Sequence, residues 1–120
     1  MLVEQSCVTI RVDLHIVKFT QMLQQFKADL FKALGHPARI RIFELLRASE
    51  TGELTVTEIQ EALGIESSST SQQLAVLRSR NLVVARKENT RVFYRVADDR
   101  IYDLLDVARS IFESQLVAMQ

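Results

Sequence analysis

The sequence predicts a mainly α-helical fold with one small β-hairpin. Apolar residues recur at three- and four-residue steps in several segments, as in helices with one buried face. Two β-branched and aromatic runs late in the chain flank a short charged turn, which is a hairpin signal. The 120 residues are 48% hydrophobic with only three Gly and one Pro, as expected for one globular domain with its own core. The expected order of elements is α-α-α-α-β-β-α.

Residues 1–13 are interpreted as an N-terminal arm or extension, and residues 14–120 as one folded domain. The arm contains three apolar residues in alternation with polar ones: Val8, Ile10 and Val12. This segment could be a short strand, a flexible arm or an upstream extension of the core, and the pattern does not choose among them. From Leu14 onward a helical period of apolar residues predicts the first helix, which Gly35 ends.

The next two helices are defined by their ends. His36-Pro37 begins the second helix, since the missing N–H of proline costs nothing in a first turn. Residues 50–53 form a loop. Thr55 and Glu58 have the spacing of a capping box and open a short third helix, which Gly64 closes.

The fourth helix is expected from about Ser67 to Arg80, with Asn81 breaking it. A helix, a tight turn at residues 64–66 and a second helix form a helix-turn-helix arrangement. The exposed side of the second of these helices should carry Ser67, Ser68, Ser69, Ser71, Gln72 and Arg78. Glutamine pairs with adenine edges, serine reaches bases or phosphates, and a helix N-terminus attracts phosphate.

Residues 82–86 and 91–96 are the two strands of the expected hairpin. They would place Arg86, Lys87 and Arg91 where a wing lies along the DNA backbone or the minor groove. This order of helix-turn-helix and basic hairpin predicts a winged helix-turn-helix fold that binds double-stranded DNA.

The charge distribution agrees with DNA binding. The formal net charge of the chain is zero, but residues 64–97 contain six basic and two acidic residues and so carry +4. Residues 1–63 carry −1 and residues 98–120 carry −3. Because exposed charges beyond about 8–10 Å are largely screened, a polyanion responds to the local patch. A Ser-rich helix start alone is most often capping, and a basic hairpin alone is often a solvated edge; the two together favour DNA.

The segments FKALGHPARIRIFELL, ELTVTEIQEALGI, SSSTSQQLAVLRSRNLV and RVFYRV resemble the ArsR/SmtB family of winged-helix repressors over residues 26–112. The resemblance implies a homodimeric repressor that is built from the first and last helices and places the fourth helix in the major groove. We expect its operator to be an imperfect palindrome. The family's DNA-contact positions fall on Ser67, Ser68, Ser69, Ser71, Gln72, Gln73, Arg86, Lys87 and Arg91. Many members have Arg-His where this chain has Gln72-Gln73, so the operator it reads would differ.

The last helix, which Asp98 can cap, and the first helix supply the expected apolar dimer interface. Its residues are Leu23, Phe26, Leu30, Leu105, Ile111 and Phe112.

No metal or other cofactor is predicted, and the effector is unknown. Where metal-sensing members have paired cysteines in the third helix, this chain has threonine, which supplies no thiolate. The last helix has four aspartates but no histidine, and carboxylates alone make a poor transition-metal site. These aspartates, Asp98, Asp99, Asp103 and Asp106, are expected to form a solvated face. A weak divalent-ion site across the dimer is the other possibility.

Two alternative functions remain. One is a winged-helix protein-interaction module without DNA binding, which the neutral net charge favours. The other is a redox- or metal-responsive repressor that uses Cys7, the only cysteine, together with His15 across two subunits. An enzyme is not expected, because there is no Gly-rich phosphate loop or nucleophile-base grouping. Without a signal peptide or a long apolar run, the protein is expected in the cytoplasm.

Overall fold

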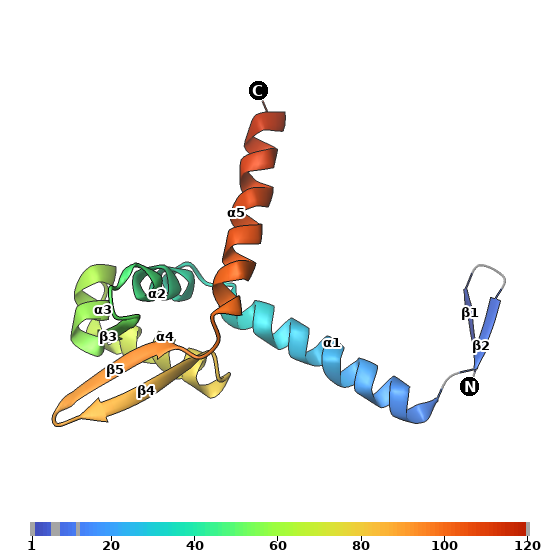
Figure 1. The fold of residues 1–120 in the computed structure, drawn as a ribbon, viewed down its shortest axis with the longest axis horizontal. Coiled ribbons are helices and arrows are strands. Elements are labelled where there is room, and N and C mark those ends of the chain that lie inside the picture. Colours follow the sequence, from blue (N-terminus) through green and yellow to red (C-terminus); the bar gives the residue numbers. More distant parts are fainter. Residues whose placement is uncertain (1, 6–7, 12, 120) are drawn as a thin grey trace. The chain divides into compact units, whose positions relative to one another are not determined.

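The computed structural model describes residues 2–5, 8–11 and 13–119. The chain divides into two compact units, Met1–Lys32 and Ala33–Gln120. The elements, labelled in Figure 1, are β1 (Leu2–Gln5), β2 (Val8–Arg11), α1 (Leu14–Leu34), α2 (Pro37–Ala48), β3 (Glu53–Thr55), α3 (Val56–Leu63), α4 (Ser67–Ser79), β4 (Val83–Glu88), β5 (Arg91–Val96) and α5 (Arg100–Ala118). None of the described helices is long and apolar enough to cross a membrane.

The first unit consists of a β-hairpin and most of α1. β1 and β2 are antiparallel, with Leu2 opposite Arg11 and Gln5 opposite Val8. The alternating pattern near the N-terminus left three possibilities open, and the structure has a strand there, β2. Asp13 then begins α1 by accepting a hydrogen bond from the N–H of His15 at 2.8 Å.

The core of the second unit lies between α2, α3, α4 and the sheet. Its fully buried large side chains are Ile42, Phe43, Leu46, Ile59, Thr70, Leu74, Leu77 and Val83. Burial of each large apolar side chain stabilises the fold by roughly 1.5–3 kcal/mol. The core thus fixes α4 against α2 and α3 through one face of α4 only.

The predicted order α-α-α-α-β-β-α is wrong in omitting three strands, β1, β2 and β3. The sheet of the second unit has three antiparallel strands in the order β3-β5-β4 rather than a hairpin alone. Glu53, assigned to a loop from the sequence, opens β3 and lies opposite Arg95. A strand of three residues has no readable alternation, and it forms because β5, about 40 residues later, offers a free edge.

The expected helix ends are confirmed. The Nδ1 atom of His36 accepts from the N–H of Ala38 at 3.1 Å, and Pro37 occupies the first turn of α2. Thr55 and Glu58 form the capping box of α3. Asn81 ends the α4 region in the left-handed conformation, with φ 59°.

Two of the four aspartates in and before α5, Asp98 and Asp106, pair with arginines. Asp98 accepts from the backbone N–H of Arg100 at 2.9 Å and from its guanidinium at 2.6 Å. Asp106 forms a two-point ion pair with Arg47 of α2, at 2.6 and 2.9 Å, and so ties α5 to α2.

Candidate nucleic-acid interface

The turn between α3 and α4 is set by Gly64. Its φ of 66° lies in the left-handed region, and its N–H donates to the carbonyl of Gln60 at 3.0 Å. A Cβ at this position would meet no atom within 4 Å, so the conformation, not lack of space, favours glycine. The Gln60 side chain donates to the Ile65 carbonyl at 2.9 Å and holds the turn against α3.

The serines that open α4 do not cap it. The N-cap residue is Glu66, whose side chain makes no capping hydrogen bond. Among the described residues, the side chains of Ser67, Ser68 and Ser71 have no hydrogen-bond partner. The interpretation of a Ser-rich helix start as capping is therefore wrong here. These hydroxyls are available to an outside partner.

The exposed side of α4 is lined by small and polar residues. An α-helix turns by about 100° per residue. Six side chains of α4 therefore lie on the side opposite the buried Leu74 and Leu77, or at the edges of that side. We call these residues the reading face: Ser68, Ser71, Gln72, Ala75, Arg78 and Ser79, all exposed. Because most of these side chains are short, a partner could approach the helix backbone closely.

Ser69 and Gln73 lie beside the reading face and are half-buried. The amide oxygen of Gln73 accepts from Nε of Arg39 at 2.8 Å. Arg39 also donates to the carbonyl of Ala33 at 3.1 Å, so it links the end of α1, α2 and α4. Gln73 thus has a structural contact that its neighbour Gln72 lacks.

The hairpin of β4 and β5 forms the wing, which Figure 1 shows as a two-stranded ribbon. Its two-residue turn includes Asn89 in the left-handed conformation, with φ 57°. Arg86 lies opposite Phe93, and the guanidinium groups of Arg86 and Arg91 lie over the Phe93 ring at 4.6 and 5.1 Å from its centroid. Successive side chains alternate between faces, so Lys87 projects from the other face of the wing.

Arg86 is neutralised by acidic residues of the same sheet. Its guanidinium contacts Glu53 of β3 at 2.7 Å and Glu88 at 2.8 Å. The hydrogen bonds to Glu53 and Glu88 raise the pKa of Arg86, and the bond from Arg86 lowers the pKa of Glu53. Lys87 and Arg91 form no ion pair in the described part of the chain. Arg95 of β5 is likewise exposed and forms no ion pair there, so Lys87, Arg91 and Arg95 are the available cations of the wing.

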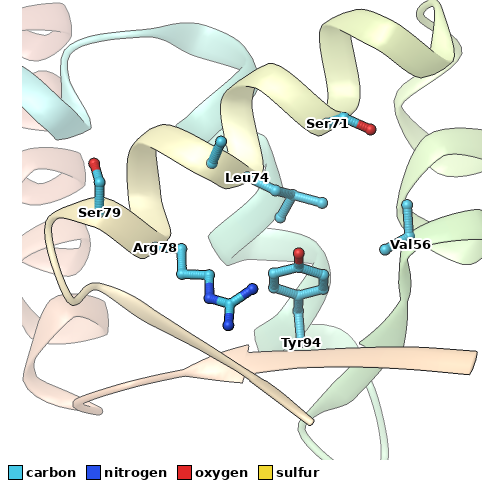
Figure 2. A pocket seen from close by; sticks show the side chains of 7 residues that line it. Val56, Ser71, Leu74, Arg78, Ser79 and Tyr94 are labelled. Atoms are coloured by element: carbon cyan, nitrogen blue, oxygen red, sulfur yellow. The ribbon is translucent and has the colours of Figure 1, made fainter. Parts of the chain in front are cut away.

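A groove of about 350 Å³ separates α4 from β5, and Figure 2 shows its walls. Seven residues line it: Val56, Ser71, Leu74, Ala75, Arg78, Ser79 and Tyr94. Tyr94 was not among the residues expected from the sequence. The signal that identifies it is the alternation in RVFYRV, which places Tyr94 on the sheet face opposite to that of Arg91 and Phe93.

The residues expected at a dimer interface differ in exposure. Phe26 of α1 and Phe112 of α5 are 63% and 58% exposed, and Ile111 is 54% exposed. Leu30 and Leu105 are half-buried within the protomer. Leu23 is 38% exposed. Four of the six residues, Leu23, Phe26, Ile111 and Phe112, are thus exposed large apolar side chains.

In the described part of the chain, no three His, Cys, Asp or Glu side chains lie close enough together to hold a metal ion. Cys7, on which the redox- or metal-responsive alternative depends, lies outside the described residues. His15, its proposed co-ligand, is exposed at the start of α1.

Comparison with known proteins agrees with the fold. A family model described as a helix-turn-helix domain matches residues 34–86. The uncharacterized HTH-type transcriptional regulator Rv0081 of Mycobacterium tuberculosis is 45% identical over 94 residues, which are 77% of this chain and 79% of that protein. The transcriptional repressor SmtB homolog of Synechocystis is 35% identical over 91 residues, which are 75% of this chain and 67% of that protein.

Solved structures give the same result. The crystal structure of Rv0081 superposes with a TM-score of 0.72 at 42% identity, covering 81% of this chain and 95% of that one. The homodimeric winged helix-turn-helix domain of Mb0332 from Mycobacterium bovis, a possible ArsR-family regulator, has a TM-score of 0.71 at 29% identity, covering 91% and 94%. The chain belongs to the ArsR/SmtB family of winged helix-turn-helix transcriptional regulators.

Proposed function

We propose that this protein is a homodimeric, sequence-specific DNA-binding repressor of transcription. The observation that carries the proposal is the reading face of α4, on which the side chains of Ser68, Ser71 and Gln72 are exposed and have no partner among the described residues. Unpaired hydroxyl and amide groups on the second helix of a helix-turn-helix are suited to hydrogen bonding with base edges in the major groove.

The DNA contacts proposed are those expected from the sequence: Ser67, Ser68, Ser69, Ser71, Gln72, Gln73 and Arg78 on α4, and Arg86, Lys87 and Arg91 on the wing. We rank them by availability. The first rank contains the residues that are exposed and without hydrogen-bond or ion-pair partners in the described chain: Ser67, Ser68, Ser71, Gln72, Arg78, Lys87 and Arg91. Gln73 and Arg86 rank last, because Arg39 binds the former and two glutamates bind the latter.

The proposed dimer is built from α1 and α5, whose large apolar side chains are exposed in the protomer. The winged helix-turn-helix domain of Mb0332 is homodimeric, which supports a homodimer here. A stable interface of this kind buries more than about 2,000 Å². A twofold axis would present two copies of α4 about one DNA turn, roughly 34–36 Å, apart and would require an imperfect palindrome as operator.

In this proposal, residues 1–13 are an arm and residues 14–120 form the DNA-binding and dimerisation domain. The protein acts in the cytoplasm, is not an enzyme and uses no cofactor. Its membership of a family of transcriptional regulators supports the functional part of this description. The effector that releases DNA is not assigned.

The competing function is a protein-interaction module that has lost DNA binding. A fluorescence-anisotropy titration against the protein's own promoter region separates the two. We expect tight binding at 50 mM salt and a steep loss of affinity by about 200 mM, because phosphate contacts release counterions. No binding at low salt would favour the interaction module.

The residue assignment is tested by combining Ser68→Ala, Gln72→Ala and Arg91→Ala in one variant. Each group is available to DNA in the structure, so we expect specific affinity to fall by at least 100-fold. The matched control is Ser69→Ala, which removes the same hydroxyl from a half-buried neighbour and should change affinity less than Ser68→Ala. Wild-type affinity in the triple variant would refute the assignment.

A further inference from the structure

The groove between α4 and β5 has an apolar floor and a polar rim. We use floor for its apolar lining residues, Val56, Leu74 and Ala75, and rim for its polar ones, which include Ser71 and Arg78 of α4 and Tyr94 of β5. Figure 2 shows Arg78 extending from α4 toward the strand beside the Tyr94 ring, while the Tyr94 hydroxyl points back toward α4.

Three polar groups on this rim are unused by the protein itself. In the described part of the chain, the Tyr94 hydroxyl, the Ser71 hydroxyl and the Arg78 guanidinium make no hydrogen bond or ion pair. The fourth, Ser79, differs because its hydroxyl donates to the Val76 carbonyl at 2.7 Å. No acidic residue lines the groove. A cation and two hydroxyls without a carboxylate nearby form a site suited to an anion.

We propose that this groove binds one sugar–phosphate unit of the DNA backbone, with Tyr94 as a DNA contact in addition to those named above. The deoxyribose would lie on the apolar floor, and its phosphate would accept hydrogen bonds from Arg78, Tyr94 and Ser71. This inference rests on the proposed function and assigns the path of the backbone between the major-groove helix and the wing.

The position of the groove favours the DNA backbone over a base or a free anion. One wall is the edge of the reading face, which would face the major groove, and the other wall is a strand of the wing. A duplex that contacts both elements must pass its backbone between them. The volume of about 350 Å³ is sufficient for one nucleotide backbone unit, and the groove is open to solvent rather than enclosed as a small-molecule pocket is.

Contacts to phosphate fix register without reading sequence. Tyr94→Phe, which removes only the hydroxyl, should therefore weaken binding about three- to tenfold on specific and non-specific DNA alike. Arg78→Gln should reduce the slope of log affinity against log salt by about one. The control is Tyr102→Phe in α5, which removes the hydroxyl of the only other tyrosine and should leave affinity unchanged.

The deciding experiment uses a duplex of about 30 bp, roughly three turns, selected with the wild-type protein from a random library. Single phosphates are replaced one at a time by neutral methylphosphonate, and affinity is measured for each duplex. The wild-type protein should bind more weakly when one particular flanking phosphate in each half-site is replaced. Arg78→Gln and Tyr94→Phe should be weaker on unmodified DNA and insensitive to the replacement at that phosphate.

Two results would overturn the inference, and they are distinguishable. If both variants bind like wild type while Ser68→Ala and Gln72→Ala bind weakly, the groove does not hold DNA but the proposed function stands. If wild type selects no sequence and binds no duplex, the proposed function fails together with the groove. Thermal unfolding of each variant checks that it is folded.

Discussion

At the scale of single residues, ion pairs within the sheet decide which cations of the wing are available. Arg86 lies between Glu53 and Glu88, so the three side chains together carry a formal charge of −1. Lys87 and Arg91 carry no such partner in the described chain. In the proposed complex, the positive potential of the wing would therefore come from Lys87, Arg91 and the likewise unpaired Arg95.

Replacing Glu53 by glutamine should strengthen DNA binding. The change removes a negative charge beside the wing and releases Arg86 toward phosphate, so we expect affinity to rise up to about fivefold at low salt. Anisotropy titrations at low and high salt measure this effect, which should fade as salt increases. Glu50→Gln, which removes the same charge from an exposed loop without an ion pair, is the control. Weaker binding would mean that Glu53 orients Arg86 for DNA.

The sequence predicted part of the site at this scale. Ser68 and Gln72 were correctly expected on the exposed side of α4, because helical periodicity alone separates them from Leu74. The contact that occupies Gln73 could not be predicted, since Arg39 lies 34 residues earlier in the chain. The neutralisation of Arg86 was missed for the same reason, because Glu53 reaches it only through the sheet.

At the scale of elements, the capping box of α3 positions the helix-turn-helix. Thr55 is 5% exposed, its hydroxyl accepts from the N–H of Glu58 at 3.1 Å, and the Glu58 carboxylate accepts from the N–H of Thr55 at 2.9 Å. The hydrogen bonds that this carboxylate accepts, first from the N–H of Thr55 and then from its hydroxyl at 2.8 Å, lower the pKa of Glu58. Both orphan donors at the start of α3 are thereby satisfied.

Thr55→Ala should destabilise the protein by roughly 0.5–2 kcal/mol, because an alanine N-cap leaves the N–H of Glu58 without its acceptor. Urea denaturation followed by circular dichroism measures the difference. Thr57→Ala, two residues later on an exposed position of α3, is the matched control and should change stability by only a few tenths of a kcal/mol. Equal effects of the two substitutions would contradict the role of the cap.

The start of α5 should make stability depend on pH. Hydrogen bonds from the Arg100 guanidinium and N–H lower the pKa of Asp98 from its ordinary 3.8 to about 2. The pKa of Asp98 is lower in the folded protein than in the unfolded chain. The charged carboxylate therefore stabilises the fold above about pH 4, and this contribution is lost as the pH falls from about 4 to 2.

Asp98→Asn should therefore lower the melting temperature at neutral pH, and the difference from wild type should shrink below about pH 4. Thermal unfolding between pH 2.5 and 7 measures it. Asp99→Asn serves as the control, since this side chain forms no hydrogen bond in the described chain. A difference that stays constant across this range would contradict the charge effect.

The helices were predictable from the sequence because their periodicity and ends are local signals, as at His36 and Gly64. β3 was not, because Glu53–Thr55 is too short to show alternation and exists through pairing with β5. A strand at the alternating residues of β2 was only one of three interpretations, and its pairing with β1 was not predicted, because short alternating runs form strands only when a partner is present.

At the scale of the whole molecule, α1 and α5 both expose large apolar side chains that a second protomer would cover. Phe112→Glu should place a charge in the proposed interface and convert the dimer to a monomer with much weaker operator affinity. Sedimentation equilibrium measures the mass, with Arg109→Glu, also on α5, as a charge-changing control at an exposed polar position. A Phe112→Glu protein that remains dimeric with full affinity would exclude this face from the interface.

Hydroxyl-radical footprinting of wild-type protein on its selected duplex tests the central claim most directly. A dimer that inserts two copies of α4 into successive major grooves predicts two protected segments, related by twofold symmetry and centred about one helical turn, or 10–10.5 bp, apart. The Ser68→Ala, Gln72→Ala and Arg91→Ala combination should abolish both segments together. A single protected segment, no protection, or protection that survives in this variant would contradict the account.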